Sequence, residues 1–534
     1  MEYFHSDKFA SLVRSLMEEH RVPGLAIGIV QGDETATAGY GVTCVETSEP
    51  VTGDTLFDVA SCAKSLTAAA VGLLVEDNDR YPEVQYHATM SSLIPEDFVM
   101  SSVEHTEGVT IDDLLGHRTG MAGHNDSLMG QRAANPDGAR SVTRNLRNLL
   151  AAAPLRARHL YCNMMYTVAT HLVEAKTGQR FSGFLEDRIL RPLNMSSTAL
   201  QPSGAKAKGL SDRVATGHYW DKVSSTHTII PAQECPESQG AGHVFSSAND
   251  FIKWVKALLR REAPITKKIY AGLVRLRSIV NPGGTRLKAL TSPAFYAAGM
   301  EIYYYRGHAV VGHNGSSGGF VSRFFFLPDL GAGGVVLANS SEAAPAVNAA
   351  CRELIDEAVG VPLEERLSGK RTVKAPVRSA KGNLGKRLGK GNPLNEQFGK
   401  KGGHKSLRPQ IAAKGSPQSV MINCQPEVKD SQPQITPLSA YVGRYSHAGY
   451  HTVAVEVKDD KLFIDATDRS LGFTLTFEHI RDERVYTAHL WDMHEGGDDL
   501  VPAEFVFEGE HAVRLGLKLE QSIKEFIWFE LEPT

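Results

Sequence analysis

The hydrophobic pattern at the start of the chain predicts a helix followed by a β-hairpin. Apolar side chains recur with helical spacing between residues 7 and 20, at Phe9, Leu12, Val13, Leu16 and Met17. Pro23-Gly24 is expected to end this helix. Two strand-like runs, residues 25–30 and 35–42, flank a short polar turn. We therefore expect a helix packed on the edge of a sheet.

The middle of the chain alternates buried helices with a group of strands. Residues 55–60 form a short, mainly apolar segment that leads to Ser61, and the Ala- and Leu-rich run after Ser61 predicts a buried helix. Further helices are expected over residues 168–177 and 251–259. Four strand-like runs then lie close together and predict the closing half of an antiparallel sheet, over residues 300–305, 308–312, 320–327 and 333–338.

The C-terminal part has the pattern of a small all-β domain. Short alternating runs predict a β-barrel or sandwich, with strands over residues 451–457, 461–465, 473–477, 504–507, 513–519 and 526–531. The polar segment Glu-Gly-Gly-Asp-Asp at residues 495–499 is expected to be a solvated turn rather than a metal site.

A basic segment separates these two parts. Residues 369–408 hold twelve Lys or Arg and the single acid Glu396, a formal charge of +11. Glycine content without apolar periodicity predicts a linker or disordered insert. Its charge could bind nucleic acid, but Phe398 is its one aromatic residue for base stacking, so a tether is the favoured interpretation. The predicted domains are residues 1–365, a linker over 366–435, and residues 436–534.

Composition narrows the class of protein. The chain has 534 residues, 42% of them hydrophobic and 22% charged, with a net charge of −4, as in a soluble globular protein of several domains. We find no secretory signal pattern and no apolar run of membrane-spanning length, so a cytoplasmic protein without membrane or nucleic-acid partners is expected. The six cysteines form no CxxC pair, and neither a metal site nor any cofactor is expected.

The first candidate for chemistry is Ser61 with Lys64. Residues three positions apart on a helix lie on the same face, so Lys64 is expected beside Ser61. The Lys64 amine could deprotonate the Ser61 hydroxyl if burial lowers the pKa of the amine. The pattern alone is weak, because Ser203 and Lys206 repeat it in a segment expected to be a loop. A helix-capping serine beside a solvated lysine is the structural alternative.

Two further segments carry candidate site residues. Tyr161 and Asn163 lie two residues apart at a strand-to-helix junction, where Tyr161 could exchange protons if a nearby ammonium stabilised its phenolate and Asn163 could hold a substrate carbonyl. Residues 313–319 form a glycine-rich turn between two predicted strands, which permits close backbone approach to a ligand. This turn also fits Gly-x-Ser-x-Gly, but a strand follows it where a nucleophile elbow requires a helix.

Taken together, Ser61-x-x-Lys64, Tyr161-x-Asn163 and His313-x-Gly315 resemble, in order and separation, the three active-site motifs of the serine β-lactamase and penicillin-binding-protein superfamily. The resemblance spans the first 360 or so residues and is nearest to the class C β-lactamase-like esterases and D-peptidases. It implies an α+β fold: an antiparallel sheet flanked by helices plus an all-helical subdomain, followed here by a small β-barrel that resembles a lipocalin-like domain.

The resemblance also implies roles. Ser61 would be the acylating nucleophile, with Lys64 and Tyr161 sharing the proton transfers. Asn163 would orient the substrate, and the backbone amides of Ser61 and Ser316 would form the oxyanion hole. The C-terminal domain would cover or shape the cleft.

One departure from the family pattern bears on the substrate. β-Lactamases and transpeptidases carry Lys-Thr-Gly at the third motif, where this chain has His313-Asn314-Gly315. Since histidine titrates near pH 6.5, we expect a weaker and pH-dependent partner for a substrate carboxylate. The leading hypothesis is therefore a serine hydrolase that acts through an acyl-enzyme on an ester, amide or thioester of a small molecule, in secondary metabolism, rather than on penicillins.

Other functions remain open at this stage. An acyltransferase of the same fold would pass the acyl group to an alcohol, and a D-amino-acid peptidase or β-lactamase would cut an amide. A catalytically silent homologue that binds ligands is the alternative from a different class, and retention of Ser61, Lys64 and Tyr161 together argues against it.

Overall fold

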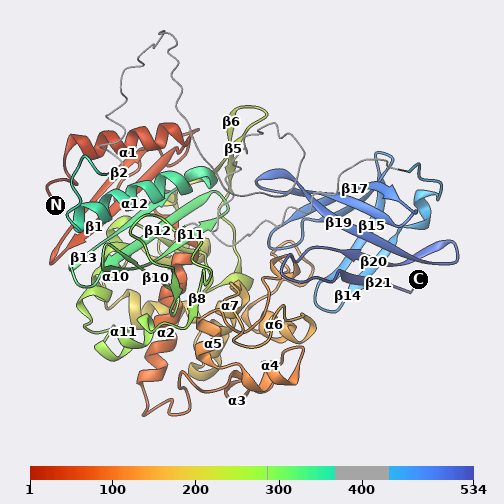
Figure 1. Cartoon of the computed structure of the whole chain (residues 1–534), viewed down its shortest axis with the longest axis horizontal. Helices are drawn as coiled ribbons and strands as arrows, with labels where there is room; N and C mark the ends of the chain where they lie inside the picture. The colour runs from red at the N-terminus through yellow and green to blue at the C-terminus, as the bar shows by residue number, and fades with distance from the viewer. Residues whose placement is uncertain (286, 367–431, 534) are drawn as a thin grey trace, which may run out of the picture.

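The computed structural model describes residues 1–285, 287–366 and 432–533. A sheet with helices on both faces and a helical subdomain form the larger unit, and a β-barrel lies beside it (Figure 1). The predicted linker over residues 366–435, with the basic segment 369–408, falls almost wholly outside the described residues, so its interpretation and the domain boundaries stay predictions.

The larger unit is built on one eight-stranded antiparallel sheet. Its strand order is β2-β1-β13-β12-β11-β10-β9-β8, so the N-terminal hairpin pairs with the last strand of the sheet through β1 and β13. The strands are β1 (Gly24–Gln31), β2 (Glu34–Gly41), β8 (Ser278–Ile279), β9 (Phe295–Tyr296), β10 (Glu301–Tyr305), β11 (His308–Ser317), β12 (Phe320–Leu327) and β13 (Ala332–Ala338).

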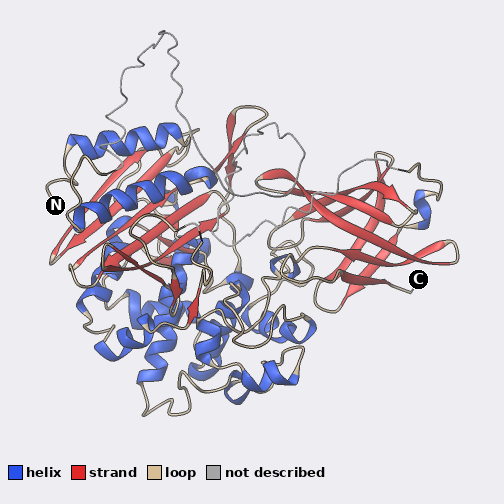
Figure 2. Cartoon of the chain, viewed as in Figure 1, coloured by secondary structure: helices blue, strands red, loops and turns tan. Residues whose placement is uncertain are grey.

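Helices cover both faces of this sheet (Figures 1 and 2). On one face α1 (Asp7–Glu19) and α12 (Ala344–Ala358) bury their apolar sides together with residues of β1, β12 and β13. On the other face α10 (Ala248–Arg260) packs on β1 and β13, and α2 (Lys64–Glu76) is buried along almost its whole length. α2 has no polar face because it runs through the interior between the sheet and the helical subdomain.

A helical subdomain packs against α2. It contains α3 (Met90–Leu93), α4 (Val103–Gly108), α5 (Ile111–Leu115), α6 (Ala139–Asn145), α7 (Asn163–Thr177), α8 (Phe181–Leu185) and α11 (Lys267–Val274), of which α7 and α11 pack directly on α2. Smaller elements complete the unit: β3 (Phe57–Asp58), β4 (Ala199–Leu200), β5 (Gly217–Asp221), β6 (Thr226–Ile230), β7 (Val244–Ser246) and α9 (Gln201–Ala207).

The C-terminal part is a closed eight-stranded antiparallel barrel, which confirms the predicted all-β domain. The strands are β14 (Gly443–His447), β15 (His451–Lys458), β16 (Lys461–Ala466), β17 (Phe473–Arg481), β18 (Val485–Asp492), β19 (Gly496–Glu508), β20 (His511–Leu517) and β21 (Ile527–Leu531). The hydrophobic pattern did not predict β14 or β18, and residues 496–499, which were expected to be a turn, begin β19.

The barrel is joined to the larger unit by polar contacts. The Glu520 carboxylate accepts a hydrogen bond from the His124 amide at 2.9 Å, and Tyr450 and His124 share one at 2.7 Å. Ser470 donates to Glu237, and Ser341 donates to Glu495 at 2.5 Å. These contacts fix the loops at one end of the barrel against the face of the larger unit.

Two local expectations were wrong. Ser203 and Lys206 lie in the helix α9, not in a loop, because Pro202 at its first turn suits the fixed φ and missing N–H of a helix start. Residues 313–317 belong to β11, and the turn is confined to Gly318 and Gly319, both at positive φ.

Within the described residues, the helices are all too short or too polar to cross a bilayer.

Candidate active site

Ser61 lies where β3 turns into α2. The chain leaves β3 through Ala60, whose φ of 45° is in the left-handed region, and residues 60–63 form one turn of 3₁₀ helix before α2 begins at Lys64. Backbone strain of this kind is tolerated only where neighbouring contacts hold it. The Ala60 amide donates to the Asp58 carboxylate at 2.8 Å and provides such a contact.

Lys64 is a buried amine with three hydrogen bonds. Its Nζ lies 3.0 Å from Ser61 Oγ, 2.8 Å from Asn163 Oδ1 and 2.7 Å from the Ala241 carbonyl oxygen. The side chain is fully buried, and this loss of water lowers the Lys64 pKa to about 7. A large fraction of Lys64 is therefore an uncharged amine near neutral pH and can accept the Ser61 proton.

Tyr161 stands beside this pair but is not a base. Burial raises the pKa of Tyr161 well above 10, and a hydrogen bond with Ser61 offsets only part of the effect. Lys64 Nζ lies 4.9 Å from the centre of the Tyr161 ring, over its face rather than at its oxygen. The expectation of an ammonium-stabilised phenolate is thus wrong, and Tyr161 is a neutral phenol that can donate a hydrogen bond or relay a proton.

A buried aromatic cluster holds Tyr161 in place. The His117 ring lies 4.2 Å from the Tyr161 ring, centre to centre, and Tyr166 and Tyr296 contact the other sides of His117. His117 Nδ1 accepts the Cys162 amide at 3.1 Å, and its backbone carbonyl accepts the Leu160 amide at 2.8 Å. These two bonds fix the segment on both sides of Tyr161.

Asn163 begins α7 and points toward the same pocket. Its Oδ1 accepts from Lys64, and its Nδ2 lies 3.4 Å from Asn125 Oδ1. The amide therefore orients the Lys64 amine in the free protein and lies at the cavity wall, where it can also meet a substrate.

Residues 313–315, the third motif, lie on an edge of β11 next to Ser61. β11 pairs with β12 from Val311 to Ser317, but its pairing with β10 ends at Gly312, so residues 313–317 have one edge that no strand of the described residues pairs. Gly315 packs closely on the turn before Ser61: a Cβ there would lie 2.4 Å from Ser322 Oγ and 2.6 Å from the Val59 carbonyl oxygen. Ser322 also donates to that carbonyl at 2.6 Å. The nucleophile turn and β11 are thus locked together.

We expect Gly315→Ala to lower kcat/KM by about 100-fold or more, because the added methyl must push β11 away from Val59, and displacing a reacting group by about 1 Å costs roughly that factor. Steady-state kinetics and thermal unfolding of the variant check this. Gly183→Ala is the matched control, since a Cβ at Gly183 meets no atom within 4 Å. Wild-type activity in Gly315→Ala would contradict the packing argument.

His313 does not provide the expected titrating cation. It is 5% exposed, its Nε2 shares a 2.9 Å hydrogen bond with the Tyr296 hydroxyl, and its Nδ1 lies 2.5 Å from the Asn314 carbonyl oxygen. Burial and, to a smaller extent, the nearby Lys64 together lower the His313 pKa to about 3. The imidazole is neutral at physiological pH, so the expectation of a pH-dependent anion partner is wrong, and His313 is a structural member of the aromatic cluster.

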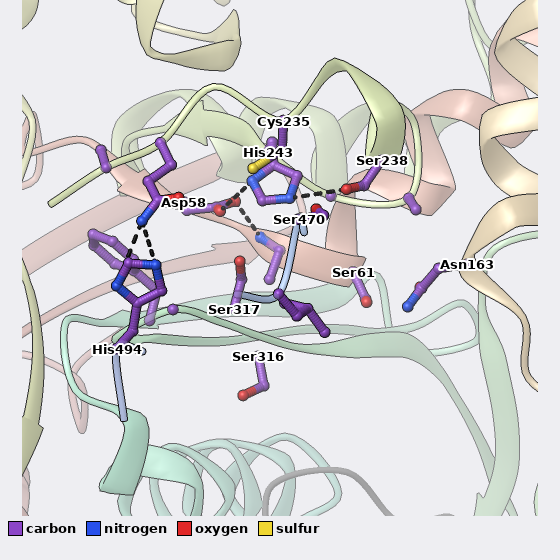
Figure 3. A pocket seen from close by; sticks show the side chains of 18 of the residues that line it. Asp58, Ser61, Asn163, Cys235, Ser238, His243, Ser316, Ser317, Ser470 and His494 are labelled. Carbon is purple, nitrogen blue, oxygen red and sulfur yellow. Dashed lines mark hydrogen bonds and ion pairs between the residues drawn. The ribbon is translucent and has the colours of Figure 1, made fainter. Parts of the chain in front are cut away.

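A cavity of about 220 Å³ opens onto Ser61. Figure 3 shows Ser61 and Asn163 at one side of it, Ser316 and Ser317 on the strand below, and His243 with Asp58 farther along the wall. Apolar walls come from Leu128, Ile230, Pro231, Phe245, Phe320 and Leu471. In the described part of the chain, neither Lys nor Arg lines this cavity.

The barrel contributes to the cavity wall. Ser470 and Leu471, between β16 and β17, and His494, between β18 and β19, all line it. His494 is hydrogen-bonded to Gln233 Nε2, which lines the same cavity. The substrate site is therefore made by both parts of the chain.

The three predicted motifs meet near one cavity, and several residues that line it were not predicted. Ser61, Asn163 and Ser316 line one pocket; Lys64 is hydrogen-bonded to Ser61 and Asn163, Tyr161 lies beside Lys64, and Gly315 packs on the turn before Ser61. His313 lies behind this pocket, and the catalytic roles of these residues stay predictions. Asp58, Asn125 and His243 were missed, although Asp58 stands only three positions before Ser61. The available signal for Asp58 was its charge within the otherwise mainly apolar segment that precedes Ser61. Among the described residues, groups of His, Cys, Asp or Glu suited to a metal ion are absent.

Comparisons with known proteins agree with this architecture. Residues 9–358 match the beta-lactamase family, and residues 427–531 match a domain of unknown function, DUF3471. An unguisins hydrolase of Aspergillus violaceofuscus is 32% identical over 512 residues, which cover 91% of this chain and 82% of that protein. An unguisins hydrolase of Aspergillus campestris is 28% identical, over 98% of this chain and 91% of that protein.

A solved structure has the same fold. The octameric penicillin-binding protein homologue of Pyrococcus abyssi superposes with a TM-score of 0.58 at 19% identity, covering 98% of this chain and 99% of that one. The chain belongs to the beta-lactamase family, which confirms the predicted resemblance and fold class. Together with the hydrolase names of its relatives, this family membership supports a serine hydrolase of this fold.

Proposed function

We propose that this chain hydrolyses an acyl bond of a small molecule through an acyl-enzyme on Ser61. The observation that carries the proposal is the 3.0 Å contact between Ser61 Oγ and Lys64 Nζ, an amine whose pKa burial lowers to about 7, at the wall of a cavity. A nucleophile paired with a base near its working pH is what acyl transfer to a serine requires.

The proton transfers follow from the hydrogen bonds. Neutral Lys64 takes the Ser61 proton as Oγ attacks the substrate carbonyl, and the ammonium that forms is stabilised by Asn163 Oδ1 and the Ala241 carbonyl. Lys64 then gives this proton to the leaving group, directly or through the Tyr161 hydroxyl. A water molecule, deprotonated by the same amine, attacks the acyl-enzyme and releases Ser61.

The developing oxyanion needs two donors close to Ser61 Oγ. We assign this role to the backbone amides of Ser61 and Ser316, because β11 carries Ser316 past the nucleophile along an edge that is left unpaired by the strands the structure describes. Preorganised amides of this kind lower the barrier without reorganisation during the reaction.

The cavity favours neutral acyl groups over penicillins. His313 is uncharged, Lys and Arg are absent from the described cavity lining, and the lining residue His243 faces the Asp58 carboxylate, so an unpaired cation for a substrate carboxylate is missing there. We therefore propose a carboxylic ester, or an amide or thioester, as the bond that is cut. The two Aspergillus relatives are named unguisins hydrolases, which supports hydrolysis as the reaction. A role in secondary metabolism stays a prediction from the sequence.

Acyl transfer to an alcohol in place of water is the second candidate. The apolar walls, one of them supplied by Leu471 of the barrel, could exclude water from the acyl-enzyme. A cytoplasmic location, and the absence of nucleic-acid and membrane partners, stay predictions from the sequence.

A panel of chromogenic short-chain esters tests the proposal. Release of the chromophore at a rate well above the protein-free rate is expected, with a burst if deacylation is slow. Repeating the assay with a small alcohol present separates the two candidates, because transfer yields the new ester and hydrolysis yields the acid. A protein that neither turns over an ester, amide or thioester nor forms a covalent adduct would be a silent homologue.

Activity is expected to rise with pH through about 7. Only neutral Lys64 accepts the Ser61 proton, so kcat/KM should fall about tenfold for each pH unit below the Lys64 pKa. A pH–rate profile between pH 5 and 9, flat above about 8, checks this. A profile with no change in slope between pH 6 and 8 would exclude Lys64 as the base.

A further inference from the structure

His243 lies in the same cavity as Ser61 but has no part in the proton transfers described above. It follows Ala241, whose carbonyl accepts from Lys64, and Gly242, where a Cβ would lie 3.7 Å from Ala60. Figure 3 shows its ring between Asp58 and Ser238, along the wall from Ser61. The segment that supports the catalytic amine thus also carries a polar side chain into the substrate space.

The backbone at His243 is held in an unusual conformation. Its φ of 58° is in the left-handed region, which glycine adopts freely and other residues at a cost. The strained residue stands one position before β7 and faces a cavity. Strain retained at a cavity wall points to a function for the side chain.

Asp58 orients the imidazole. Asp58 is 3% exposed, and its Oδ1 is fixed by the Ala60 amide at 2.8 Å, while its Oδ2 lies 3.4 Å from His243 Nδ1. The other ring nitrogen, Nε2, lies 3.5 Å from Ser238 Oγ, the outer limit of a hydrogen bond, and the Cys235 side chain also hydrogen-bonds the ring. Since Asp58 engages Nδ1, Nε2 remains as a donor that a ligand can take over.

The imidazole also carries charge. Burial by itself lowers the His243 pKa, but the Cys235 thiol and the Asp58 carboxylate outweigh burial and raise that pKa well above 6.5. The raised pKa favours the protonated ring beside the Asp58 carboxylate, so the pair adds little net charge to the cavity. Such a pair favours a neutral oxygen with a strong dipole over a carboxylate, which Asp58 would repel.

We propose that His243, positioned by Asp58, binds a peptide-type carbonyl oxygen in the acyl part of the substrate through Nε2–H. This inference rests on the proposed function and names its substrate class: acyl groups that bear an amide, such as N-acylated amino acids. The apolar residues around the cavity would hold the side chain of that amino acid. His243 is then a specificity-determining residue, and Asp58 its positioning residue.

Two matched esters test the proposal. The p-nitrophenyl esters of N-acetylphenylalanine, as each enantiomer, and of 3-phenylpropanoic acid differ in the acetamido group. The ratio of their kcat/KM values measures recognition of the amide. His243→Gly removes the side chain and suits the positive φ, so folding should be retained, and His243→Asn is a second variant that tolerates this φ.

In the wild type the better N-acetylphenylalanine enantiomer is expected to be preferred, and His243→Gly should reduce that preference about tenfold or more, the typical worth of a hydrogen bond from a charged donor. The preference should also decline as pH rises and His243 loses its proton, and Asp58→Asn should move that decline to lower pH. His308→Gln, at a histidine that also pairs with an aspartate, Asp329, but lies outside the cavity lining, should keep the wild-type preference.

Equal losses for both esters in His243→Gly and His243→Asn would show a structural role and overturn the proposal. An unchanged preference in these variants, or an equal loss of preference in His308→Gln, would also overturn it. Covalent labelling of Ser61 in the wild type by a fluorophosphonate, which carries no acyl amide, is measured separately. Absence of that label would refute the proposed function itself, whereas a label with no His243 effect would refute only this inference.

Discussion

Ser61→Ala is expected to lower kcat/KM for a chromogenic ester by about 10⁴-fold or more. The variant keeps the cavity and the amide of residue 61, so binding and part of the oxyanion stabilisation remain, but the covalent step is lost. The alanine fits the site, because Ser61 Oγ is needed only as a partner of Lys64 Nζ and Tyr161. Steady-state kinetics of purified wild type and variant measure the ratio.

The chain contains its own control for this experiment. Ser203 repeats the Ser-x-x-Lys spacing with Lys206, but it lies in α9 and its hydroxyl donates to Glu234 at the surface. Ser203→Ala should therefore retain wild-type activity. Similar activity in wild type and Ser61→Ala would assign the turnover to a different nucleophile.

Lys64→Met is expected to lower kcat/KM by about 10³-fold or more, because the variant removes the base and the proton donor for the leaving group in one change. Lys64→Arg should be equally impaired, since a guanidinium does not lose its proton in this pH range. Lys206→Met is the matched control. Wild-type activity in Lys64→Arg would show that a neutral amine is not required.

The same buried amine makes stability depend on pH. Lys64 has a pKa of about 7 in the folded chain and about 10.4 when unfolded, so the unfolded chain binds the extra proton between these values. The free energy of unfolding should therefore rise with pH through that window, by an amount on the order of a few kcal/mol. Thermal unfolding of wild type and Lys64→Met at pH 7 and 9 measures it, and the variant should lack this gain.

The elements with a single apolar face were predictable from the sequence. α1 shows one apolar stripe over residues 7–20, and β10 to β13 are short runs bounded by turn residues, so periodicity identified them. β18 was missed because its residues 485–492 mix His, Thr and Asp with apolar positions, and only closure of the barrel gives them partners. Strand pairing across sequence is set by the fold and not by local pattern.

The site was predictable to the level of its motifs. Ser61 and Lys64 meet because helical geometry alone brings positions three apart together, and the burial that lowers the Lys64 pKa follows from the apolar run around it. His313 was predicted as a titrating cation because its burial against Tyr296 depends on a residue 17 positions away. The pairing of Asp58 with His243 joins segments 185 positions apart, and no local pattern reveals it.

The most direct test of the central claim is the mass of the protein after reaction with a fluorophosphonate, followed by peptide mapping. One adduct on the peptide that contains Ser61, absent from Ser61→Ala and retained in Ser203→Ala, is the result we predict. An adduct on another residue, or an unmodified wild-type protein under conditions in which it turns over an ester, would contradict an acyl-enzyme on Ser61.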